Sequence, residues 1–202
     1  MEKTMQKIKR YIRHTLAIAF LITAISAINA AAATFTVTNT ANTGAGSLRQ
    51  AVLDSNAAAG LDTIVFDSSF NSAQTITLAS TLVIDSADNT GTTITGPGAA
   101  LLTVSDNNAV RVLDIRASET VTISGMTMTQ GNGMTGTSPG SGGAIYSNDS
   151  TVTLNGVVVS GNSATSEGGG IYFTANRNLT ITNSTITNNT GGSFGGGLRI
   201  SW

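Results

Sequence analysis

The chain has 202 residues, about the length of one domain, and its formal net charge of −1 hides an uneven distribution. Five of its 10 Lys and Arg residues precede residue 15, and residues 34–202 carry 10 acidic and 5 basic side chains. A chain of this sign does not attract nucleic-acid phosphates, so we expect no nucleic-acid partner.

Several reactive residue types are missing from most of the chain. There is no Cys, the single histidine is His14, and no Lys follows residue 15. Beyond residue 33 this excludes Ser–His and Cys–His nucleophile pairs, Schiff-base lysines and His-ligated metal sites. We therefore predict no catalytic, cofactor-binding or metal-ligating residue, and we expect burial and backbone pairing to stabilise the fold without disulfides.

Residues 1–33 have the pattern of an export signal. Basic residues come first, an apolar run from Leu16 to Ile28 follows, and Ala30 to Ala33 form a small-residue tract. This order predicts a secretory signal peptide. An uncleaved N-terminal anchor is the alternative. Because the run is shorter than the ~20 residues of a membrane-spanning helix, we expect the mature chain not to span a membrane.

The remainder contains an internal repeat of roughly 27 residues. Three copies align over residues 121–146, 152–172 and 179–199, with a fainter one near Thr93. Each begins with alternating apolar and Thr-rich positions and leads to a Gly-Gly motif such as Gly168-Gly-Gly-Ile-Tyr172. Alternation with period two is typical of half-buried strands, and Gly125, Gly156 and Asn183 tolerate a tight bend between them.

Short strands that recur at this period predict an all-β fold, a right-handed single-stranded parallel β-helix over residues 74–202. Like residues would stack one rung apart at ~4.8 Å. The outward positions are rich in Thr, Ser and Asn, which suit stacked columns. Antiparallel hairpins in a β-sandwich are the competing interpretation, since Asn-Gly is also a hairpin signal.

Equivalent positions of the repeats separate the core from the surface. One column is entirely apolar, and we place it in the core: Leu113, Ile145, Ile171 and Leu198. The next position mixes both charges with two phenols: Asp114, Tyr146, Tyr172 and Arg199. Burial of such a column would leave charges unpaired, so we expect it to face water.

Residues 34–73 differ from the repeats and predict a short N-terminal cap, which an open rung needs. A strand begins at Phe35, Ser47 can N-cap a helix over 48–56, and a second strand spans 63–66. The apolar face of the helix should hold Leu48, Val52 and Leu53. At the other end no polar terminal unit follows Ile200. We therefore expect a truncated C-terminus whose last rung is frayed or pairs with another chain, which permits end-to-end self-association.

Two motifs carry a resemblance to a known family. Gly46-Ser-Leu-Arg-Gln-Ala51, followed by Asp62-Thr-Ile-Val-Phe66, resembles the start of bacterial extracellular right-handed β-helix repeat proteins. The Gly-Gly-Ala-Ile-Tyr segment at 142–146 is similar to repeats of polymorphic outer-membrane and autotransporter adhesins. The resemblance implies a secreted or outer-membrane protein that displays an adhesin-like surface for an unknown surface or carbohydrate ligand.

Other right-handed β-helices are polysaccharide lyases or glycoside hydrolases, so a carbohydrate-active enzyme is the alternative function. A hydrolase needs two carboxylates ~5–9.5 Å apart, and a lyase needs acidic Ca²⁺ ligands with a basic side chain. The available pairs are Asp62 with Asp67, Asp85 with Asp88, and Asp106 with Asp114.

Arg111, Asp114 and Arg116 could imitate the lyase set, but we favour the interpretation that they form a solvated charge cluster on one rung. Tyr146 and Tyr172 could form a sugar-stacking platform, although we favour an ordinary outward aromatic ladder.

Overall fold

The computed structural model describes residues 2, 4–6, 31–116, 118–134, 138–174 and 176–202. Residues 1–30 and residues 31–202 form separate compact units. Most of the predicted export segment, residues 1–33, lies outside the described residues. Within the described ranges, no helix combines the length and apolar character needed to cross a membrane.

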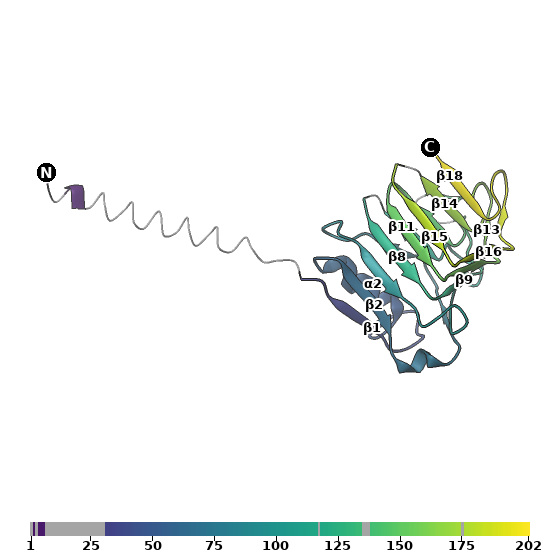
Figure 1. Cartoon of the computed structure of the whole chain (residues 1–202), viewed down its shortest axis with the longest axis horizontal. Coiled ribbons are helices and arrows are strands. Elements are labelled where there is room, and N and C mark those ends of the chain that lie inside the picture. The colour runs from purple at the N-terminus through teal and green to yellow at the C-terminus, as the bar shows by residue number, and fades with distance from the viewer. Residues whose placement is uncertain (1, 3, 7–30, 117, 135–137, 175) are drawn as a thin grey trace. The chain divides into compact units, whose positions relative to one another are not determined.

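The second unit is a parallel β-solenoid built from three long sheets and one short sheet (Figure 1). Sheet A contains β1 (Thr34–Val37), β2 (Asp62–Phe66), β5 (Thr92–Thr95), β8 (Thr120–Ser124), β11 (Thr151–Asn155) and β15 (Leu179–Thr182). Sheet B contains β3 (Gln74–Thr77), β6 (Leu102–Ser105), β9 (Thr127–Thr129), β12 (Val158–Ser160) and β16 (Thr185–Thr187).

Sheet C contains β4 (Leu82–Ile84), β7 (Leu113–Ile115), β10 (Ile145–Ser147), β14 (Ile171–Thr174) and β18 (Leu198–Ser201). The short sheet D pairs β13 (Ser163–Ala164) with β17 (Thr190–Gly191). Each strand pairs in parallel with the equivalent strand of the next rung, as β8 does with β11 and β15. The predicted parallel β-helix is confirmed, and the antiparallel sandwich is wrong.

The predicted core column is also confirmed. Leu113, Ile145, Ile171 and Leu198 are register partners across sheet C. The first three are at most 3 % exposed, whereas Leu198 of the last rung is only partly buried. Other apolar side chains of that rung are exposed more strongly, Ile200 by 39 % and Phe194 by 57 %. The core is therefore well covered in the middle of the solenoid and more open at its last rung.

The bends between sheets use left-handed backbone at equivalent positions of successive rungs. Between sheets A and B, Gly125, Gly156 and Asn183 have φ of +60°, +63° and +50°, as the sequence predicts. At the bend before sheet C, the neighbouring backbone also leaves no space for a side chain. A Cβ on Gly142 or Gly168 would lie 2.3 Å from the carbonyl oxygen of the residue three positions on. Asparagine can replace glycine at the first bend, but only glycine fits the second.

The N-terminal helix α2 (Leu48–Ala57) is capped as predicted, with the Ser47 side chain accepting a hydrogen bond from the Gln50 N–H. Its buried face holds Leu48, Ala51, Val52 and Ser55, whereas Leu53 is 54 % exposed. The predicted face was therefore wrong at Leu53, because positions i, i+3, i+4 and i+7 share one side of a helix. The helix packs against β1, β2 and β4. A 3-10 helix, η1 (Ser68–Asn71), follows β2.

Candidate functional site

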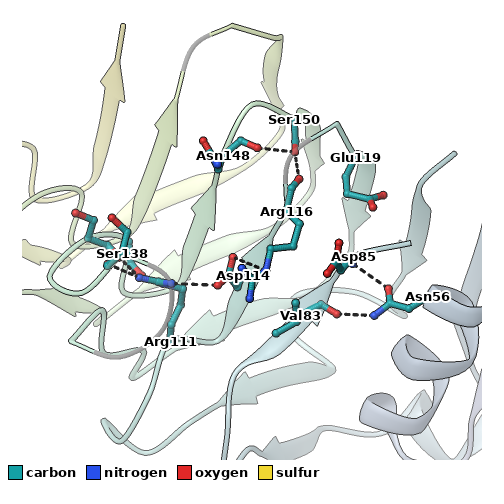
Figure 2. A network of polar contacts seen from close by, with 12 residues as sticks. Asn56, Val83, Asp85, Arg111, Asp114, Arg116, Glu119, Ser138, Asn148 and Ser150 are labelled. Carbon is teal, nitrogen blue, oxygen red and sulfur yellow. Dashed lines mark hydrogen bonds and ion pairs between the residues drawn. The ribbon is translucent and has the colours of Figure 1, made fainter. Parts of the chain in front are cut away.

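The charged residues that imitate a lyase site lie together on the outer side of sheet C. Asp114 of β7 stands between Val83 of β4 and Tyr146 of β10 in the sheet register. The Arg111 Nη1 atom lies 3.5 Å from Asp114 Oδ2, and Arg116 Nε lies 3.8 Å from Oδ1 (Figure 2). We call these three residues, Arg111, Asp114 and Arg116, the arginine cluster.

The sequence predicts that the arginine cluster and the outward column of sheet C face water. This prediction is wrong for Arg111, Asp114 and Tyr146. Arg111, Asp114 and Tyr146 are 0 %, 1 % and 9 % exposed. Arg111 donates hydrogen bonds to the carbonyls of Ser138, Ser141 and Gly142 at 2.9, 2.6 and 2.8 Å.

The cluster can be buried because the carbonyls accept from Nε and Nη2 of Arg111 while Nη1 forms an ion pair with Asp114, so the charge of Arg111 has a counter-charge. Burial lowers the pKa of Arg111, and the charge of Asp114 acts against that shift. Arg116 differs from Arg111, since its side chain is 37 % exposed. The arrangement holds the segment 138–142 against sheet C and leaves only the edge of the cluster open to solvent.

Tyr146 is stacked between Tyr172 and the arginine cluster. The rings of Tyr146 and Tyr172 are 5.4 Å apart and nearly parallel, at 3°. The Arg111 guanidinium lies over Tyr146, 4.8 Å from the ring centroid. Since Arg111 precedes β7 and Tyr172 belongs to β14, they cover opposite faces of Tyr146. The aromatic-ladder interpretation is favoured, because a sugar needs an open ring face.

Three other carboxylates of the candidate acidic pairs accept hydrogen bonds from backbone N–H groups. Asp62 is buried and accepts a hydrogen bond from the Ala33 N–H at 2.8 Å. Asp67 caps η1. Asp88 is exposed and accepts from the Gly60 N–H, and this bond contributes most to lowering the pKa of Asp88. These hydrogen bonds to backbone N–H groups give the three carboxylates structural partners without a substrate.

Two fully buried acids lie elsewhere in the solenoid. Asp106, in the turn after β6, is 0 % exposed, and neither of its oxygens makes a hydrogen bond of normal geometry to a described residue. Burial raises the pKa of Asp106 to about 7, while nearby backbone N–H groups, that of Asn132 foremost, oppose the rise.

Glu119 is 1 % exposed and accepts from the Ser86 N–H at 2.6 Å and from the Ser86 hydroxyl. Burial raises the pKa of Glu119. No sequence pattern marks Glu119 as buried, because its partner Ser86 lies one rung away. Across the described part of the chain, no three acidic or histidine side chains gather into a metal site.

The sequence matches no protein-family model, and neither a curated protein nor a solved structure is similar to it.

Proposed function

We propose that this chain is an exported scaffold that acts by display and binding, adhesin-like, and not by catalysis. The observation that carries the proposal is the buried arginine cluster. Arg111 has no exposed surface, and its guanidinium is engaged by three carbonyls, a carboxylate and an aromatic face. A side chain held in this way cannot reach a polysaccharide, so the residues that most resemble catalytic ones have a structural role.

Export to the cell surface or to the medium is the second part of the proposal. The basic start of the chain, the apolar run to Ile28 and the alanine tract support it. The similarity of its Gly-Gly motifs to outer-membrane adhesin repeats points to a bacterial surface.

Catalysis is tested with the purified full chain, polygalacturonate and Ca²⁺, by following unsaturated product in the ultraviolet. We expect no turnover. The informative variant is Arg116→Ala, because Arg116 is the exposed member of the cluster, and Arg177→Ala is its control on a separate exposed ion pair with Asp149. Turnover that disappears in the first variant and persists in the second would contradict the proposal.

Export is tested by fractionating a bacterial host that expresses the full chain. We expect protein outside the cytoplasm with a new N-terminus near residue 34, identified by N-terminal sequencing. Protein that stays in the cytoplasm with residues 1–33 attached would contradict this part of the proposal.

A further inference from the structure

The outer face of sheet A carries an uninterrupted column of threonines, one from each of six rungs. Consecutive members are register partners across the whole sheet: Thr34, Thr63, Thr93, Thr122, Thr153 and Thr180. All six side chains are half-buried or exposed. Figure 1 shows the strands that carry them side by side, from β1 through β2 and β8 to β15. We call this surface the threonine face.

A second outward column runs parallel to the first, two residues along each strand. It consists of Thr36, Val65, Thr95, Ser124, Asn155 and Thr182. Neither column contains a charged or aromatic residue. Rungs repeat at ~4.8 Å and alternate residues of a strand at ~6.7 Å, so the two columns form a neutral grid in which hydroxyl and methyl groups predominate. The outward column of sheet C differs, with Asp114, Tyr146 and Arg199.

The hydroxyls of the first column are free to bind something outside the protein. Within the described residues, none of the six makes a side-chain hydrogen bond to another protein group. No column of sheet B is comparable to the first column of sheet A. One of its columns is interrupted by Val158, which has no hydroxyl, and the other contains Ser105, which is buried and donates to Gln130. A third position, Thr127, donates to the carbonyl of Ala99.

We propose that the threonine face binds ice, an inference that rests on the display function and names its ligand. An uncharged grid that repeats at ~4.8 Å across the strands and ~6.7 Å along them suits a solid whose surface also repeats in two dimensions. Threonine contributes a hydroxyl that holds one water and a methyl that orders its neighbours, so the face can align water on the lattice.

Other ligand classes fit the threonine face less well. Anionic polymers need basic side chains, and the two columns have none. A soluble sugar chain favours a concave site with aromatic walls, and the outward positions carry no ring.

The test measures thermal hysteresis and inhibition of ice recrystallisation with the purified full chain. We expect the wild type to be active and Thr122→Glu to lose activity about tenfold or more, because a carboxylate must be desolvated at the ice contact. Thr129→Glu is the matched control. Thr129 is also a half-buried, outward threonine, and it lies on β9 of the same rung, on sheet B. This control should keep its activity.

Circular dichroism of each variant establishes that the solenoid is intact. If Thr122→Glu does not fold, Thr122→Val replaces it, since valine keeps the shape and removes only the hydroxyl; a folded Thr122→Val variant with full activity would overturn the proposal. Equal loss in the Thr122 and Thr129 variants would overturn the assignment to sheet A.

An inactive wild type that adsorbs to crystalline cellulose or chitin would overturn the ice proposal and leave the scaffold function standing. Turnover of a polysaccharide would instead overturn the scaffold function.

Discussion

Arg111→Met gives the sharpest test of the buried arginine cluster. The substitution keeps most of the apolar stem and removes a guanidinium with no exposed surface. Three carbonyls of residues 138–142 lose their donor, Asp114 loses the nearer of its two arginine partners, and the face of Tyr146 loses its cation. Removing one member of a buried ion pair costs ~3–5 kcal/mol, so we expect a loss of unfolding free energy in that range.

The assay is urea denaturation followed by circular dichroism, with Arg177→Met as the control. Arg177 also pairs with a carboxylate, at 3.8 Å from Asp149, but its side chain is 48 % exposed. Its loss should cost at most ~1 kcal/mol. Asp114→Asn and the double variant Arg111→Met/Asp114→Asn complete a cycle, in which we expect a coupling of ~1–3 kcal/mol.

Similar costs for Arg111→Met and Arg177→Met would refute this reasoning, because they would mean that the Arg111 guanidinium is as well hydrated as an exposed one. A cycle without coupling would show that the stabilisation comes from the carbonyls alone and not from the ion pair.

Three further predictions concern the pH dependence, the core and the bends. Because burial raises the pKa of Asp106 to about 7, the stability that its protonated form contributes is fully present below its ordinary pKa of ~4 and is lost as pH rises through 7; the free energy of unfolding from urea denaturation should fall by ~2–4 kcal/mol across this window, and Asp106→Asn should flatten the profile. Ile171→Asp should cost ~4 kcal/mol or more in urea denaturation, whereas Tyr172→Asp loses only a ring stack of ~0.5–1.5 kcal/mol, and equal costs would contradict the assignment of core and surface. Gly168→Ala places a Cβ 2.3 Å from a carbonyl oxygen and should cost more than ~2 kcal/mol, while Gly156→Ala, with a similar positive φ and open space, should cost ~1 kcal/mol in melting experiments.

Much of the fold follows from local chemistry that the sequence displays directly. The alternation around Val121, Val152 and Leu179 predicts strands and the repeat predicts their register, since like residues of a solenoid stack. The bends at Gly156 and Asn183 follow in the same way, because few residue types tolerate a positive φ.

The burial of the arginine cluster could not be predicted from the sequence. Alternation shows that Asp114 points away from the core but not that residues 138–142, some 27 positions later, hold Arg111 against sheet C. Glu119 was missed for the same reason, because its partner Ser86 lies 33 residues earlier.

For the candidate binding surface, the sequence by itself determined that threonines occupy outward positions in each repeat. Only the tertiary structure decided that Thr34 and Thr63, outside the recognised repeats, continue the same column, and that sheet A presents a more complete face than sheet B. The physical reason is the range of the interactions. Side-chain direction is set within a strand, whereas the covering of an outward side chain depends on segments a full rung away.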